Sequence, residues 1–387
     1  MPSSMRVEGT VAEGFEGVRE EFAAVLEAEA HDTGAQLAVY RHGRRVVDLW
    51  AEGAEPATGG ELTGLHSVTK GAAHLVVALL VQDGILELDR EVAAYWPEFA
   101  AEGKDALTLR ELLQHRAGAI GVEGGFTLDE LADDRLLARR LAGHRPYWKP
   151  GTRSGYHALV IGALTGEVVF RATGRTLKEH YEKRIRAPHG LDFHLGLPEW
   201  LEPHYRPVLP MRPTPEQAAE LAAAEAPGEA LRVAFNWHAA EPTDLVEYAN
   251  SRTIRANGPA SAGGVGNARG VAGMYAAAIS GLDGAAPLLK PDTIAEFTGL
   301  QTPGPDAVTG EPDLFALGFR ASQVVYPYLG ADSFGHSGAA GAESWADPGT
   351  GLAYAYTRRL WAYPGGAAPE NLRLGAAVLG AYAESSD

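Results

Sequence analysis

Strand patterns occur near both ends of this 387-residue chain, and a long stretch with helical patterns separates them. Near the N-terminus, Gln36–Tyr40 and Arg45–Trp50 flank the turn residues Arg41-His-Gly-Arg44, which predicts a β-hairpin. Towards the C-terminus, alternating patterns predict three strands, at about 315–323, 333–337 and 352–359. This order favours an α/β architecture in which both termini contribute to one sheet and the helical segment packs against it.

Helix signals are clear in several other places. Residues 12–30 show an amphipathic pattern whose apolar face comprises Phe15, Val18, Phe22, Val25 and Leu26. Capping boxes predict four helix starts, at Thr108, Thr127, Thr176 and Thr214. Three more helices are expected in the C-terminal part, at about 268–281, 291–300 and 369–383. Together with the strands, these helices indicate the α/β (α+β) class.

Composition argues against several classes of function. Lys and Arg number 33 against 50 Asp and Glu, so the net charge is −17, and the acidic residues are spread along the chain. Such a charge argues against nucleic acid or an anionic membrane as a partner. Because Cys is absent, disulfides and thiolate metal sites are not possible. The N-terminus lacks a signal-peptide pattern and no apolar run has membrane-spanning length, so we expect a soluble, cytoplasmic protein.

The segment Leu65–Gly84 is predicted to be a buried helix with a candidate nucleophile at its start. Ser67 and Lys70 would lie one turn apart on one face of this helix. A serine hydroxyl is a weak nucleophile until a base takes its proton, and a lysine can be that base when burial lowers its pKa. Because Ser three positions before Lys arises easily by chance, an ordinary capped core helix remains the alternative.

A tyrosine follows a loop in the middle of the chain. Pro150-Gly151 and Gly155 mark this loop, which delivers Tyr156 to the start of an apolar helix over residues 159–173. A phenol at such a place can pass a proton between an amine, a serine and a leaving group. The alternative is a buried aromatic anchor with a bonded hydroxyl.

A glycine-rich stretch, Ser333–Gly341, is the third candidate. Small residues at Gly338 and Ala339 would let a substrate approach backbone N–H groups, as an oxyanion hole requires, although a tight hairpin explains them equally well. The same stretch nearly matches the Gly-x-Ser-x-Gly elbow of α/β-hydrolases, with Ser337 as nucleophile. That interpretation is disfavoured, because the elbow needs a helix after its serine and a histidine further along the chain, and His336 is the last histidine.

The histidines and large aromatics are less specific. His115 is expected to end a helix, where a histidine favours the dipole, and no histidine pair has metal-ligand spacing. His157 and His336 are candidate polar contacts of a substrate. Large aromatics are candidate pocket residues, although such residues fill cores more often than sites: Trp148, Trp237, Tyr205, Phe126 and Trp345. We expect neither a metal nor a cofactor.

The three stretches together, in this order, resemble the serine β-lactamase and DD-peptidase (penicillin-binding-protein-like) superfamily. The motifs are Ser67-x-x-Lys70, Tyr156-His-Ala158 and His336-Ser-Gly338, and the closest resemblance is to the β-lactamase-like carboxylesterases, the family VIII esterases. The resemblance covers roughly residues 15–384. It implies a β-lactamase/transpeptidase-like fold with an antiparallel sheet domain of residues 1–64 and 262–387, a helical domain of residues 65–261, and a site in the cleft between them.

The resemblance also implies roles for individual residues. Ser67 would be the nucleophile, Lys70 the general base and Tyr156 the proton relay, while the backbone N–H groups of Ser67 and Ala339 would hold the oxyanion. The third motif, with Ser337 and Gly338, would contact the substrate. Penicillin-recognising members have Asn in place of Ala158 and Lys in place of His336, groups suited to the amide and carboxylate of a β-lactam.

We therefore predict a serine carboxylesterase that acts on a small-molecule ester through an acyl-enzyme. An acyltransferase, an amide hydrolase or a weak β-lactamase with the same site are alternatives, because a fold does not fix the reaction. A scaffold that binds an acyl ligand without turnover is a further alternative, disfavoured by the intact motifs. The sequence does not decide whether the chain forms a homo-oligomer.

Overall fold

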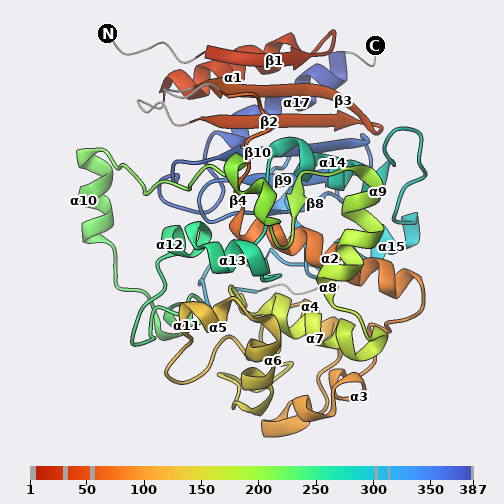
Figure 1. Cartoon of the computed structure of the whole chain (residues 1–387), viewed down its shortest axis with the longest axis vertical. Helices are drawn as coiled ribbons and strands as arrows, with labels where there is room; N and C mark the ends of the chain where they lie inside the picture. The colour runs from red at the N-terminus through yellow and green to blue at the C-terminus, as the bar shows by residue number, and fades with distance from the viewer. Residues whose placement is uncertain (1–5, 29–33, 53–56, 301–303, 313, 385–387) are drawn as a thin grey trace.

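The computed structural model describes residues 6–28, 34–52, 57–300, 304–312 and 314–384. Within these residues, the main sheet has seven strands in the order β1-β3-β2-β10-β9-β8-β7, all neighbours antiparallel (Figure 1). The strands are β1 (Arg6–Val11), β2 (Ala35–Arg41), β3 (Arg44–Glu52), β7 (Arg320–Ala321), β8 (Phe334–Ser337), β9 (Glu343–Asp347) and β10 (Leu352–Arg358). Because β10 pairs with β2, strands from the two ends of the chain meet inside one sheet. The predicted fold class is confirmed.

β2 and β3 form the predicted hairpin, and its turn is shorter than the sequence pattern suggested. Arg41 pairs with Arg44, so His42 and Gly43 alone make the turn. Both have left-handed backbones, with φ of 48° and 75°, as in the two-residue turns that match the twist of the strands. A Cβ at Gly43 would lie 2.2 Å from the carbonyl oxygen of Gly281, so this position has no space for a side chain.

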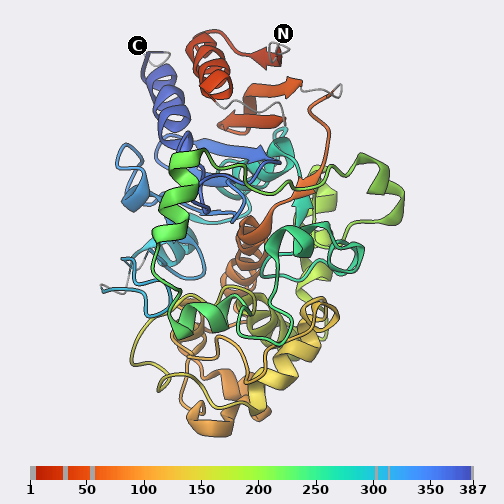
Figure 2. The same cartoon turned by 90° about the vertical axis from the view of Figure 1, so that its left-hand side faces the viewer.

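The two faces of the sheet carry side chains of different size. Large residues such as Leu37 and Val39 face α1 (Glu16–Ala28) and α17 (Asn371–Glu384), which pack against each other (Figure 2). On the other face the sheet presents alanines to α14 (Ala268–Ile279): Ala38, Ala346, Ala353 and Ala355. Alternate residues of a strand point to opposite faces, which explains how one strand serves both layers.

The segment between the strands from the two ends is mostly helical. It contains α2 (Thr69–Gln82), α3 (Val92–Tyr95), α4 (Leu109–Leu113), α5 (Leu128–Leu131), α6 (Asp134–Gly143), α7 (Ile161–Thr173), α8 (Leu177–Tyr181), α9 (Ala187–His189), α10 (Pro215–Ala223), α11 (Glu229–Ala234), α12 (Leu245–Asn250) and α13 (Arg252–Asn257). The four predicted capping boxes are all present, at the starts of α4, α5, α8 and α10. A small sheet in the order β4-β6-β5 joins this segment to the rest; its strands are β4 (Thr63–Gly64), β5 (Phe193–His194) and β6 (Val265–Gly266).

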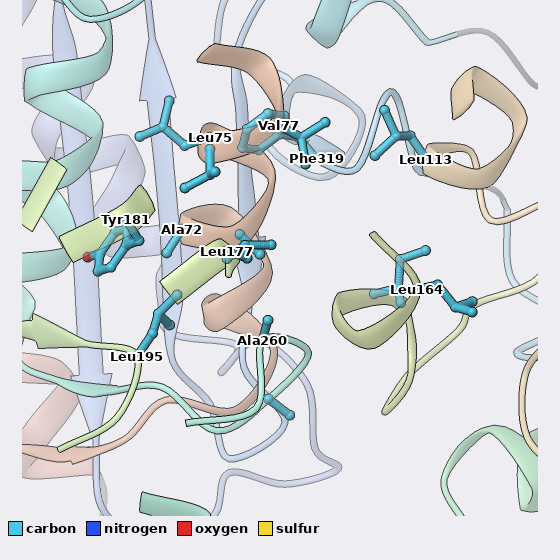
Figure 3. Packing of buried hydrophobic residues seen from close by; sticks show 14 of the residues in the cluster. Ala72, Leu75, Val77, Leu113, Leu164, Leu177, Tyr181, Leu195, Ala260 and Phe319 are labelled. Carbon is cyan, nitrogen blue, oxygen red and sulfur yellow. The ribbon is translucent and has the colours of Figure 1, made fainter. Parts of the chain in front are cut away.

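Helix α2 lies in the middle of the larger hydrophobic core. Every residue from Thr69 to Leu80 is buried, so the helix is covered on all sides and not on one face only. Figure 3 shows Leu177 and Tyr181 of α8 beside it, and Ala260 near the end that carries Ala72. The predicted buried helix is confirmed, and its surroundings decide the electrostatics of any polar group that it carries.

Some boundaries differ from the predictions. The strand expected at 315–323 is wrong over most of its length, because Gly318 has a φ of 78° and the chain turns back so that Ala316 N–H donates to the Phe319 carbonyl. Only β7 and the short α16 (Ser322–Val325) follow. Strands β1 and β9 were not predicted. The predicted helices at 12–30 and 291–300 correspond to α1 and to α15 (Pro291–Thr298), and residues 29–30 lie outside the described residues.

Across the described part of the chain, no helix is both long enough and apolar enough to span a bilayer.

Candidate active site

Ser67 lies in a 3-10 turn, His66–Val68, directly before α2. One turn along, the Nζ atom of Lys70 lies 3.1 Å from Ser67 Oγ. Ser67 is half-buried, whereas Lys70 is completely buried. His66 has a left-handed backbone with a φ of 47°, a strained conformation for a residue with a side chain. The structure thus holds a serine hydroxyl on the solvent side of a buried amine.

Tyr156 approaches the same hydroxyl from the loop before α7. Its Oη atom lies 2.8 Å from Ser67 Oγ. The ring stacks on Phe315 with centroids 5.2 Å apart, and Gly155 N–H donates to the carbonyl of His115, which fixes the loop. The sequence predicted Tyr156 at a helix start; α7 begins a few residues later, at Ile161. The three groups of the first two motifs are therefore in direct contact.

Lys70 has polar neighbours but forms no ion pair with any of the described residues. Its Nζ donates to the carbonyl oxygens of Ala158, at 2.6 Å, and of Ser261, at 2.8 Å, in addition to its contact with Ser67. Burial disfavours the ammonium form and lowers the pKa of Lys70 well below its ordinary value. A neutral amine in this position has a lone pair that can accept a proton.

Burial acts on Tyr156 in the opposite direction. It disfavours the phenolate and raises the pKa of Tyr156 above its ordinary value, and the hydrogen bond with Ser67 offsets only part of this effect. Tyr156 is therefore a neutral phenol near pH 7, able to donate a proton and unsuited to be the resting base. Of the two groups beside Ser67, the amine is the one that burial turns into a base.

Strand β8 lies against the turn that carries Ser67. A Cβ at Gly338 would lie 2.5 Å from the carbonyl oxygen of Leu65, so only glycine permits this approach. The next residue, Ala339, is half-buried, and among the described residues no acceptor is recorded for its N–H. The N–H of Ser67 belongs to the first turn of a helix, where amides lack intrahelical partners. An oxyanion hole requires two backbone donors, and these two N–H groups stay the predicted ones.

Ser337 belongs to a buried network that the sequence did not reveal. Its Oγ accepts a hydrogen bond of 2.9 Å from Arg320, whose guanidinium also pairs with Glu343. Glu343 in turn accepts a hydrogen bond of 2.6 Å from Tyr326. A turn and strand β9 follow Ser337 where a nucleophile elbow would have a helix. Its partner is thus a permanent cation and not a base, which agrees with the prediction against Ser337 as nucleophile.

Comparison with known proteins gives this geometry a context. Residues 20–377 match the model of the family described as Beta-lactamase. The chain belongs to the beta-lactamase family. It is 30% identical to the Esterase/beta-lactamase LipL of Mycobacterium tuberculosis (strain ATCC 25618 / H37Rv), over 90% of this chain and 82% of that protein. The predicted family is confirmed.

Solved structures of the family superpose on nearly the whole chain. EstA from Arthrobacter nitroguajacolicus Rue61a is 40% identical, with a TM-score of 0.89 over 99% of this chain and 100% of that one. A family VIII carboxylesterase is 31% identical, with a TM-score of 0.87 over 97% of this chain and 100% of that one. A penicillin-binding protein homologue from Caulobacter crescentus is 32% identical, with a TM-score of 0.85 and the same coverage.

Within this family fold, the histidines near the site are buried and uncharged. His115 follows the end of α4, as predicted, but it does not carry the charge that favours the helix dipole: burial lowers its pKa well below the ordinary value, and its Nδ1 accepts the N–H of His157 at 3.1 Å. His157 is also fully buried and its pKa falls to about 4, so it is uncharged near pH 7; its contact with the substrate stays a prediction. His336 stacks on Tyr156 with centroids 6.2 Å apart. Among the described residues, no cluster of histidine and acidic side chains could hold a metal ion.

The candidate pocket aromatics separate into two groups. Trp148 and Trp237 are half-buried near the site. Trp148 packs edge-on against His157 at 5.9 Å, and Trp237 stacks on Phe235, whose ring lies 6.2 Å from that of Tyr156.

The other three expected pocket aromatics lie in cores, and for them the expectation was wrong. Trp345 is fully buried and stacks on Tyr354 at 4.9 Å, in the core that α1 and α17 cover. Phe126 belongs to the main core, and Tyr205 to a separate small cluster. Two half-buried aromatics beside Tyr156, Phe235 and Phe315, were missed because no motif marks them.

Proposed function

We propose that this chain is a carboxylesterase-type serine hydrolase that cleaves small-molecule esters through an acyl-enzyme on Ser67. One observation carries the proposal: Ser67 Oγ lies within hydrogen-bond distance of both a buried amine and a buried phenol. LipL and the family VIII carboxylesterase are similar to this chain over most of its length. Both are named as esterases, which supports ester hydrolysis.

Acylation begins with transfer of the Ser67 proton to neutral Lys70. Ser67 Oγ forms a bond to the ester carbonyl carbon, and the carbonyl oxygen becomes an oxyanion between the N–H groups of Ser67 and Ala339. These donors would act without rearrangement, because Ser67 lies in the turn before α2 and Ala339 directly follows Gly338, which packs on Leu65. When the tetrahedral intermediate collapses, the bond to the leaving alkoxide breaks.

The leaving alkoxide needs a proton, and Tyr156 can supply it. Its Oη hydrogen moves to the alkoxide while the proton held by Lys70 replaces it, which restores both groups. Water then attacks the acyl-enzyme, the same groups move its proton to Ser67 Oγ, and the carboxylic acid leaves. The site would lie between the sheet residues (1–64 and 262–387) and the helical segment (65–261), each of which contributes motifs.

The charge distribution favours neutral esters over β-lactams or carboxylate-bearing amides. Burial keeps His336 uncharged at the position where penicillin-recognising members have Lys. The nearby cation, Arg320, is engaged by Glu343 beneath β8. Neither His336 nor Arg320 therefore offers a free cation to a substrate carboxylate, and protonation of Lys70 to bind one would remove the base.

The test is substitution of the proposed nucleophile together with covalent labelling. Ser67→Ala should abolish hydrolysis of a short-chain aryl ester, and a fluorophosphonate should label Ser67 in the unmodified chain. Ser337→Ala is the matched control, because it should still be labelled at Ser67. Turnover that survives in Ser67→Ala, or a label that maps to Ser337, would refute the proposal.

A further inference from the structure

The start of α7 lies against the catalytic lysine, and a loop from elsewhere in the chain supplies an acceptor for its first turn. Gly162 is the second residue of α7, so its N–H has no partner within the helix and needs an acceptor from elsewhere. The Ala158 carbonyl accepts from Lys70 Nζ at 2.6 Å, and Gly162 N–H donates to Ser261 Oγ at 2.8 Å. The carbonyl of the same Ser261 is the second acceptor for Lys70 Nζ, at 2.8 Å. Ser261 therefore contacts the amine of Lys70 through its carbonyl and the start of α7 through its side chain.

The loop that carries Ser261, residues 259–264, is tied at several points. Asp134, at the start of α6, accepts the N–H of Ala260 through Oδ2 at 2.9 Å. At the other end, Gly264 N–H donates to Thr69 Oγ1 at 2.9 Å, which joins the loop to α2 one residue before Lys70. The position of the Ser261 carbonyl is therefore set by contacts on both sides of it.

Gly162 is a tight contact in this arrangement. A Cβ at this position would lie 2.3 Å from the carbonyl carbon of Ala260 and 2.4 Å from the nitrogen of Ser261. Both are backbone atoms of the loop, so a side chain could be accommodated only by moving the loop away from α7. The lack of a side chain at Gly162 allows the Ala260–Ser261 peptide to pack closely against the start of α7.

The arrangement has a consequence for the direction of the lone pair of Lys70. A neutral amine has two hydrogens, and the carbonyls of Ala158 and Ser261 accept both of them. The lone pair is then left to point at the third neighbour, Ser67 Oγ. Two backbone acceptors would in this way orient the base as well as bind it.

We propose that Gly162, the Ser261 hydroxyl and Asp134 are positioning residues that fix the Ser261 carbonyl and thereby aim the lone pair of Lys70 at Ser67. The inference rests on the proposed function, and it adds residues that no motif contains. None of the three touches the substrate, so their substitution should slow proton transfer and leave substrate binding unchanged.

The test compares two Gly→Ala changes one turn apart on the same helix. Gly162→Ala needs a loop shift of about 1 Å to bring the contact with Ala260 from 2.3 Å to an ordinary distance. A misplacement of that size costs about 100-fold in rate, so kcat and the rate of fluorophosphonate labelling should both fall by about 100-fold with KM essentially unchanged. Gly166→Ala is the control, because its Cβ would meet only Leu177 Cβ at 4.0 Å and should change neither rate.

Variants at two more positions keep the test independent of folding and of the proposed function. If Gly162→Ala does not fold, Ser261→Ala tests the same link: it removes the hydroxyl that ties the loop to Gly162 N–H, so the Ser261 carbonyl is less well fixed and kcat should again fall. Asp134→Asn retains an acceptor for Ala260 N–H and should keep more of the rate than Asp134→Ala. Wild-type kcat in Gly162→Ala or in Ser261→Ala, while Ser67→Ala is inactive, would overturn the positioning role and leave the esterase proposal standing. Turnover in Ser67→Ala would refute the esterase itself.

Discussion

Replacing Tyr156 by Phe removes a single oxygen atom and separates two roles of this side chain, the packing of its ring and proton transfer by its hydroxyl. The ring would keep its stacking on Phe315, where the centroids lie 5.2 Å apart, and its contact with His336. The contact of 2.8 Å between Oη and Ser67 Oγ would be lost. The variant therefore tests the phenol as a proton relay without disturbing the packing that positions it.

The expected magnitudes for activity and stability are very different. A positioned acid–base group contributes about 10²–10⁴-fold to a rate. At 1.36 kcal/mol per tenfold, that corresponds to about 3–5 kcal/mol of activation free energy. The folded state loses one hydrogen bond, about 1 kcal/mol. With an unfolding entropy of about 2.1 cal/mol/K per residue over 387 residues, Tm should fall by only about 1 °C.

The assay is kcat/KM for an aryl ester alongside a thermal melt, with Tyr181→Phe as the control. Tyr181 also has a buried hydroxyl, which donates to the carbonyl of Phe193 at 3.0 Å, but it touches neither Ser67 nor Lys70. Both variants should lose similar stability, and only Tyr156→Phe should lose activity. If Tyr156→Phe retained kcat/KM within about tenfold, below the range for acid–base groups, the relay would be refuted.

Three further predictions concern charge. The value of kcat/KM should rise as pH increases through the lowered pKa of Lys70, because only the neutral amine is a base. The value of kcat/KM should not fall again below about pH 10, because burial raises the pKa of Tyr156. A bell-shaped profile centred near neutrality would contradict this prediction. Lys70→Arg should be nearly as inactive as Ser67→Ala in the ester assay, because a guanidinium does not deprotonate; substantial turnover would exclude Lys70 as the base. Glu343→Gln leaves Arg320 without its buried anionic partner and should lower the free energy of unfolding by about 3–5 kcal/mol in denaturant titration; an unchanged midpoint and slope would show that the pair is not needed for stability.

The sequence predicted those features that depend on the type of residue. Capping boxes, the turn at Gly43 and the apolar helix after Ser67 each require particular side chains, so their pattern is visible in one chain. The contact among Ser67, Lys70 and Tyr156 was predicted because three ordered motifs together resemble a known family, although two of these residues lie 89 positions apart. Where the pattern was ambiguous, as in the alternation near Gly318, a left-handed glycine replaced the expected strand with a turn.

Contacts made by main-chain atoms could not be predicted, because they leave no pattern of residue types in the sequence. The acceptors of Lys70 are the carbonyls of Ala158 and Ser261, which every residue type possesses, so no motif could indicate them. The locations of the large aromatic side chains could not be predicted either. Trp148 and Trp345 have no distinguishing sequence pattern, and only the packing places one near the site and the other in the core.

The hydrophobic core around α2 therefore has a chemical role as well as a structural one. Burial lowers the pKa of Lys70, and among the described residues no carboxylate forms an ion pair with its amine. An acidic partner would hold the amine as an ammonium and prevent it from taking a proton from Ser67. Neutral carbonyl acceptors satisfy its hydrogens without restoring that charge. A core substitution that admitted water near Lys70 would raise its pKa, so packing defects around α2 should shift the acid limb of kcat/KM to higher pH before they unfold the protein.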